Sequence, residues 1–189
     1  MTLRRPAIAA TIVAALLLAG CTATPPAPTP TAATPTPTAP CLVGTWEAGR
    51  DALQPVYDAI PAELDYPAAT LAPEASVTVS FAADGTFSLT QDVPVTLEWE
   101  GHPAAVALGG TMAGGYAASG TALTLTATAD KLTVAPADDR PASALFAAAT
   151  QETLTEWPVA ASSFQCDGDA LTLQLETEGH VAPVEFARR

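Results

Sequence analysis

The sequence predicts a mainly β domain: an antiparallel up-and-down barrel of about 8–10 strands with a short helix after the first strand. Three observations lead to this prediction. Apolar residues recur at every second position over most of residues 76–188, short glycine-containing turns separate these runs, and the clearest helical pattern follows the first strand. A meander of this kind must close or cover its edges, and closure into a barrel removes them.

The first predicted elements are a strand that contains Cys41–Trp46 and a helix directly after it. Asp51 can cap this helix, with Gln54 three residues later as in a capping box, and Pro61 ends it. We expect residues 65–73 to form a loop. The apolar face of the helix consists of Leu53, Val56, Tyr57 and Ile60.

Residues 76–135 predict a series of short strands joined by tight turns. Alternation begins at Val77 and, after a hairpin turn at Ala83–Gly85, returns through Phe87. Further strands are expected at 95–99, 105–117, 123–125 and 132–134.

Glycine pairs at 109–110 and 114–115 interrupt the longest of these strands. They predict bulges or sharp bends, as a barrel corner needs, and on an inward face they would leave volume for a cavity. Residues 136–161 are less regular, with one or two helical turns expected over 143–150. The remaining chain alternates again through Leu171, Leu173, Leu175, Val184 and Phe186.

Residues 1–20 have the features of a signal peptide, with a short apolar run that ends in Leu18-Ala19-Gly20-Cys21. This resembles the lipobox of bacterial lipoproteins, in which the cysteine is diacylated and becomes the new N-terminus. The alternative is an ordinary secretory signal with a chance cysteine. Residues 22–40 contain only Thr, Ala and Pro, so residues 21–40 are expected to be a lipidated cysteine followed by an extended linker.

The expected folded domain, residues 41–189, is strongly acidic. All 20 acidic residues follow residue 40 but only five basic residues do, which gives a formal net charge of −15. Such a domain repels nucleic acid and anionic headgroups, so the expected membrane contact is through acyl chains on Cys21. We expect the protein to be lipid-anchored on the outer face of the cell membrane, with no nucleic acid partner.

The expected extracytoplasmic location also predicts how the cysteines pair. If Cys21 carries lipid, Cys41 and Cys166 remain as an even pair in an oxidising compartment, which predicts a disulfide. The alternative is two free buried thiols.

Gly44, Thr45 and Trp46 on the first strand, with Arg188 near the end of the last, resemble the lipocalin (calycin) pattern. In that family a G-x-W motif opens the first strand, its tryptophan plugs the barrel base and an arginine packs across the indole. The resemblance implies a lipocalin-like barrel with Gly44, Trp46 and Arg188 as its base plug. The whole layout resembles small bacterial surface lipoproteins with such a domain.

The main alternative fold is an immunoglobulin-like β-sandwich, but its tryptophan and cysteine spacing differs from the one found here. Two functions suit the barrel. It binds a small apolar or amphipathic ligand, or it has a solid core and serves as a non-enzymatic surface interaction module. The candidate ligand-lining residues are Phe81, Phe87, Leu97, Trp99, Leu108, Met112, Tyr116 and Leu125.

No catalytic, metal-binding or cofactor-binding motif is recognisable, so we expect no enzymatic activity, no cofactor and no metal. His102 and His180 lie beside turns and are expected to be exposed rather than a metal pair. Glu98 and Glu100 alternate on one strand face and are expected to form a solvated outer surface.

Overall fold

The structure is a computed structural model that describes residues 39–59, 68–99, 101–154, 160–177 and 180–189. The predicted signal peptide, Cys21 and nearly all of the linker therefore lie outside the described residues. So do Ile60, Pro61 and Glu100, together with the side chains of Trp99 and His180.

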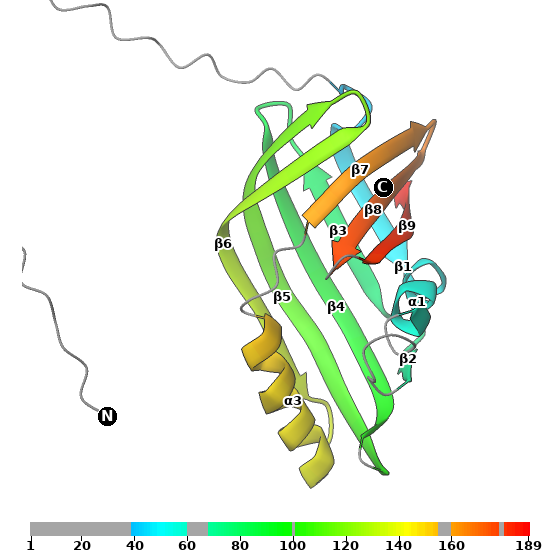
Figure 1. Cartoon of the computed structure of the whole chain (residues 1–189), viewed down its shortest axis with the longest axis vertical. Helices are drawn as coiled ribbons and strands as arrows, with labels where there is room; N and C mark the ends of the chain where they lie inside the picture. Colours follow the sequence, from blue (N-terminus) through cyan, green and yellow to red (C-terminus); the bar gives the residue numbers. More distant parts are fainter. Residues whose placement is uncertain (1–38, 60–67, 100, 155–159, 178–179) are drawn as a thin grey trace, which may run out of the picture. The chain divides into compact units, whose positions relative to one another are not determined.

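The described part contains nine strands and two helices, and Figure 1 shows their arrangement. In chain order they are β1 (Gly44–Gly49), α1 (Arg50–Ala59), β2 (Ala69–Leu71), β3 (Ser76–Phe81), β4 (Thr86–Trp99), β5 (His102–Ser119), β6 (Ala122–Pro136), α3 (Pro141–Leu154), β7 (Ala160–Asp167), β8 (Ala170–Thr177) and β9 (His180–Arg188).

Eight of these strands form a closed antiparallel barrel. The order around it is β4-β3-β1-β9-β8-β7-β6-β5, and β5 pairs back onto β4. The short strand β2 continues the row of β3, because both pair with the same edge of β4. The predicted barrel, with its helix after the first strand, is confirmed, and the β-sandwich alternative is wrong.

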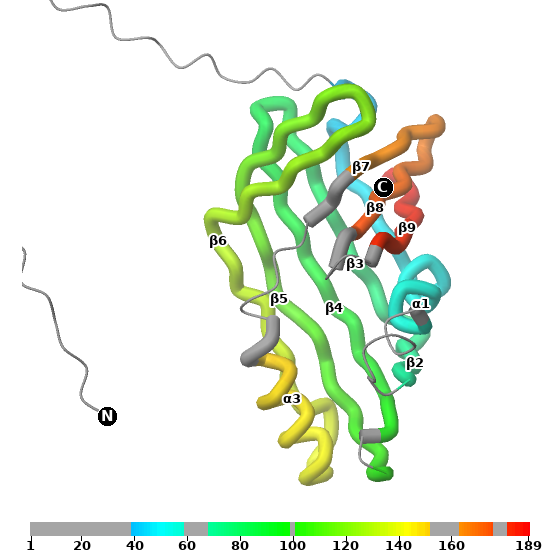
Figure 2. Tube along the Cα trace, in the orientation of Figure 1, coloured from blue at the N-terminus to red at the C-terminus, as the bar shows by residue number. Residues whose placement is uncertain are grey.

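The hydrogen bonding around the barrel is uneven. β4 pairs with β5 over the whole length of β4, and Figure 2 shows these two segments running side by side. By contrast, β6 and β7 share a single register pair in the described part, Ala122 with Ser163. One further backbone bond, from the Phe164 N–H to the Thr121 carbonyl, supports this junction.

β4 and β6 are each longer than the sequence predicted. β4 is one strand from Thr86 to Trp99, whereas alternation suggested two pieces. β6 includes Asp130 and Lys131, and its register against β5 shifts between Ala113 and Gly114. This β-bulge explains why the inward phase changes from odd numbers at Leu123 and Leu125 to even numbers at Leu132 and Val134.

The glycines at the bend allow β5 and β6 to approach closely. A Cβ on Gly110, whose φ is +106°, would collide with the Lys131 carbonyl oxygen. A Cβ on Gly114 would collide with the Thr126 carbonyl oxygen in the same way. The predicted bend is therefore present, but the predicted free volume is wrong, because the backbone of β6 occupies that space.

α1 covers part of the sheet through Leu53, which is buried, with Val56 and Tyr57 half-buried beside it. Gln54 has a different role from the predicted capping box. Its amide nitrogen donates to the Ala69 carbonyl at 2.8 Å and its oxygen accepts from the Leu71 N–H at 2.9 Å. These bonds hold the strand β2 within a segment that was predicted to be loop.

α3 is longer than the predicted 143–150 and lies along β5 and β6 (Figure 1). Pro141 begins it, a position that needs no N–H partner. The fully buried Ser143 hydroxyl donates to Asp138 at 2.6 Å and accepts from the Ala105 N–H at 2.9 Å. Gln151 accepts from the Val134 N–H at 2.7 Å, which attaches the helix to the edge of β6.

Candidate functional site

The base of the barrel is closed by Trp46 and Arg188. The Trp46 side chain is completely buried, and its indole N–H donates to the Leu42 carbonyl at 2.7 Å. The Arg188 guanidinium carbon lies 4.1 Å from the centroid of the Trp46 ring, which is within cation–π distance. The two residues are also register partners on β1 and β9.

Arg188 additionally binds the chain that leads into β1. Its two terminal nitrogens donate to the carbonyl oxygens of Val43 and Cys41, both at 3.2 Å. Its Nε forms an ion pair with Asp169 at 3.4 Å. Gly44 leaves the space that this guanidinium occupies, because a Cβ there would collide with an Arg188 nitrogen.

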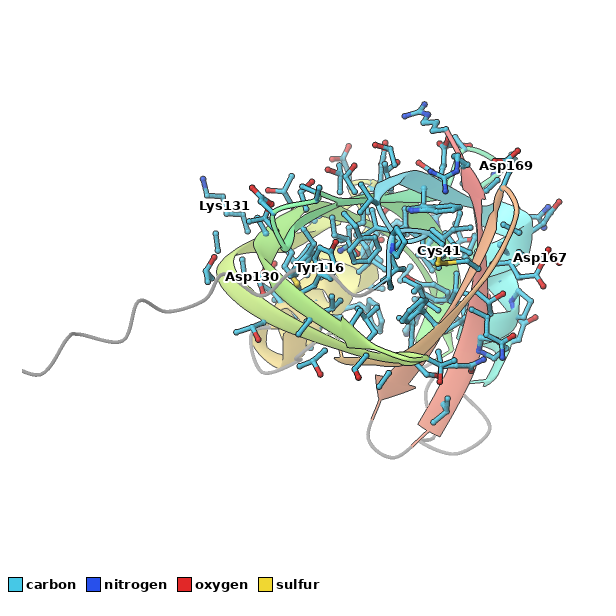
Figure 3. The ribbon with its side chains drawn as sticks, turned by 90° about the horizontal axis from the view of Figure 1, so that it is seen from above. Cys41, Tyr116, Asp130, Lys131, Asp167 and Asp169 are labelled. Carbon is cyan, nitrogen blue, oxygen red and sulfur yellow. A yellow bond between two sulfur atoms is a disulfide. The ribbon has the colours of Figure 1, made fainter. Side chains whose placement is uncertain are left out.

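Cys41 and Cys166 form a disulfide with a Cα–Cα distance of 6.2 Å, so the predicted bridge is confirmed and the free-thiol alternative is wrong. The bridge joins the residue three positions before β1 to β7, across 125 positions of sequence. Figure 3 shows Cys41 with its sulfur bond and labels Asp167, the last residue of β7, and Asp169 in the turn that follows it. Disulfide, arginine and tryptophan together hold residues 41–43 to the barrel base.

Most of the predicted ligand-lining residues lie in the packed core. Tyr116 illustrates this: its ring packs against Phe81 at 5.0 Å between centroids, and its hydroxyl donates to the Ala82 carbonyl at 2.9 Å. Desolvation, followed by the nearby Asp84 carboxylate, raises the pKa of Tyr116. In Figure 3 the strands enclose Tyr116 among other side chains. The predicted residues that are buried are Phe81, Phe87, Leu97, Met112 and Tyr116.

Leu108 and Leu125 are only partly buried, and the side chain of Trp99 lies outside the described residues. Leu108 and Leu125 belong to a larger set of inward-facing side chains with intermediate exposure. This set comes from β3, β4, β5 and β6, and its members are Val77, Leu89, Gln91, Leu108, Leu125 and Leu132. We call it the half-buried ring.

Members of the half-buried ring lie beside fully buried core residues. Leu89 pairs with Val79 and Met112, and Leu125 pairs with Tyr116. Sequence alternation indicated which apolar side chains face inward but could not separate packed from accessible ones. Gln91 was missed altogether, although its position between Leu89 and Val93 in the inward phase marked it.

A separate apolar groove lies beside β2, β4 and β5 and encloses about 320 Å³. It is lined mainly by Leu71, Pro73, Pro94, Val106 and Ala137. It contains none of the half-buried ring, although the core residues Val95 and Val106 also line it. The half-buried ring and this groove are the two candidate binding regions.

The polar residues considered from sequence do not assemble into a site. His102 and Glu98 are exposed. Within the described ranges, no group of three or more His, Cys, Asp or Glu side chains is placed to hold a metal ion. Among the same residues, no helix is long and apolar enough to cross a membrane.

Comparison of the chain with family models and with curated proteins finds no match.

Proposed function

We propose that the domain binds one small apolar or amphipathic molecule inside its barrel and that its function is non-enzymatic. The half-buried ring supports this proposal. Apolar side chains from four strands, including Leu89 and Leu132, face inward without being fully buried. An eight-stranded barrel has room for either filled side-chain layers or one small ligand. Partial exposure of inward side chains favours the second arrangement.

Displacement of the neutral fluorescent probe N-phenyl-1-naphthylamine tests this proposal. The protein is the full chain with Cys21→Ser, which removes the proposed lipidation site and keeps detergent out of the assay. Leu89→Trp should fill the interior and weaken probe binding at least tenfold. Thr90→Trp is the matched control, because its side chain is exposed on the outer face of the same strand.

Thr96→Trp separates the barrel interior from the apolar groove, of which Thr96 is a lining residue. Weaker binding in this variant, with Leu89→Trp unaffected, would place the probe in the groove and overturn the proposal. Native mass spectrometry of the Cys21→Ser chain should also detect a bound small molecule.

The alternative function is an interaction module with a solid core. Its support is that Phe81, Phe87 and Met112 are each no more than 3% exposed, as filled core layers would be. Under this alternative the wild-type barrel binds no probe, and Leu89→Trp lowers stability without any effect on a ligand.

We further propose that the protein is anchored by acyl chains on Cys21 to the outer face of the cell membrane. The support is the sequence Leu18-Ala19-Gly20-Cys21 after an apolar run, followed by the Thr/Pro-rich linker. Two or more acyl chains give stable anchoring. Cys21→Ser should release the protein from the membrane fraction after a salt wash, and full retention of this variant would contradict the anchor.

A further inference from the structure

Gln91 places one polar side chain in the middle of the apolar barrel interior. Cα register aligns it with Val77 on β3 and with Gly110 on β5, and Gly110 aligns with Leu132 on β6. Paired residues in an antiparallel sheet point to the same face. Gln91 therefore belongs to the inward row that contributes Val77 and Leu132 to the half-buried ring.

The Gln91 amide makes no hydrogen bond to the described residues. The helix residues Gln54 and Gln151 differ from it in this respect. Gln54 and Gln151 each bond a backbone carbonyl and a backbone N–H. Gln91 has intermediate exposure, so water can satisfy its amide while the interior is empty. A ligand that displaces this water must supply a hydrogen-bonding group, or the amide loses its partners at a free-energy cost.

The surroundings of Gln91 indicate which kind of group suits it. The other inward side chains of β3 and β5 in the described part are apolar, except that of Tyr116, whose hydroxyl is already bonded to Ala82. No charged residue faces inward from these two strands. A charged head group would therefore lose its hydration without gaining an ionic partner from β3 or β5. An anionic head group would also be repelled by the −15 net charge of residues 41–189.

We propose that Gln91 recognises the uncharged, hydrogen-bonding head group of an amphipathic ligand, such as a hydroxyl or an amide, whose chain contacts the half-buried ring. This inference rests on the proposed function, which it makes more specific. A few well-placed polar groups in an apolar pocket commonly determine ligand orientation and specificity.

Three ligands with the same ten-carbon chain test the proposal: 1-decanol, decanoate and decylammonium. Each competes with N-phenyl-1-naphthylamine for the full Cys21→Ser chain. We expect wild type to bind 1-decanol at least tenfold more tightly than either charged ligand. Gln91→Leu should weaken 1-decanol binding about tenfold, the loss expected for one hydrogen bond, while leaving affinity for the probe within twofold.

Gln165→Leu is the control, because this glutamine is exposed on β7 and should leave all affinities unchanged. Gln91→Met provides a second apolar replacement if the leucine variant does not fold, as judged by circular dichroism. Probe binding without head-group preference, or a preference that survives both substitutions, overturns the role of Gln91 and leaves the proposed function intact. Absence of all binding in wild type overturns the proposed function and this inference together.

Discussion

Gln54 and Gln151 make the same pair of hydrogen bonds at two different strand edges. Each side chain accepts from one backbone N–H and donates to the carbonyl two residues earlier: Leu71 and Ala69 on β2 for Gln54, and Val134 and Leu132 on β6 for Gln151. Both glutamines lie on helices, so each helix satisfies backbone groups that a neighbouring strand would otherwise bond. An unpaired edge is thereby covered at each place.

Replacing either glutamine should therefore destabilise the domain. Gln54→Leu and Gln151→Leu each leave a backbone donor and a backbone acceptor to water, which should lower the free energy of unfolding by about 1–2 kcal/mol. Urea unfolding measures this change. Gln165→Leu, at an exposed position, should stay within about 0.5 kcal/mol of wild type, and equal effects for all three variants would contradict edge coverage.

Arg188→Ala should destabilise the domain by about 1–2 kcal/mol, because it removes the contact with Trp46 and the bonds to Val43 and Cys41. Arg189→Ala should have a smaller effect, since Arg189 forms an ion pair with Glu47 at 3.0 Å rather than covering the indole, and its side chain is 64% exposed. Thermal unfolding of both variants tests this difference.

Trp46→Ala should cost more, about 3–5 kcal/mol, as expected for a large buried aromatic side chain. Its effect should not add to that of Arg188→Ala, because the two residues share one contact. Additive effects in the double mutant would show that the Arg188–Trp46 contact contributes little to closing the barrel base.

Gly110→Ala should destabilise the domain by about 2–4 kcal/mol, because the new methyl group meets the Lys131 carbonyl and the backbone φ is +106°. Gly109→Ala is the matched neighbour. Its nearest non-neighbouring atom, the Thr133 hydroxyl oxygen, would lie at an ordinary 3.7 Å, so its effect should be much smaller. Denaturant midpoints that change equally for the two substitutions would disprove the close approach of β5 and β6.

Alkaline conditions should reveal the desolvation of the Tyr57 hydroxyl. Desolvation raises the pKa of its hydroxyl from 10.0 to about 12. Above pH 10 the unfolded chain loses this proton while the folded chain retains it, so stability is full below pH 10 and falls as the pH rises towards 12. The loss should reach about 2 kcal/mol near pH 11.5. Tyr57→Phe should remove this part of the pH dependence, and an unchanged profile would argue against it.

Period-two alternation was sufficient to predict the barrel, because each strand buries one face and exposes the other. The positions of strand ends were less predictable. The odd-to-even change between Leu125 and Leu132 has two explanations at the sequence level, a turn or a bulge. Only the pairing with β5 shows that β6 continues through Asp130 and Lys131 with a bulge.

The residues of the barrel base could be predicted from the sequence, whereas the accessible residues of the barrel interior could not. Gly44, Trp46 and Arg188 were identifiable because Gly44–Trp46 resembles the lipocalin G-x-W motif and Arg188 shares the strand phase of Val184 and Phe186. Gln91 shares the inward phase of Leu89, but alternation cannot show which inward side chains remain accessible, since that depends on how residues from distant strands fill the barrel. Gln54 and Gln151 could not be assigned either, because their partners lie 15 to 19 residues away in sequence on strands whose edges were unknown.

The bonds at Cys41 also determine how the domain responds to mechanical tension. A force applied to the chain before Cys41 passes through the disulfide into β7 and, through the Arg188 hydrogen bond, into β9. Without these connections the same force would peel β1 away from its first residue, breaking its hydrogen bonds to β3 and β9 one after another. The oxidised domain therefore distributes a pull over several strands at once, whereas the reduced domain would unzip from its N-terminal end.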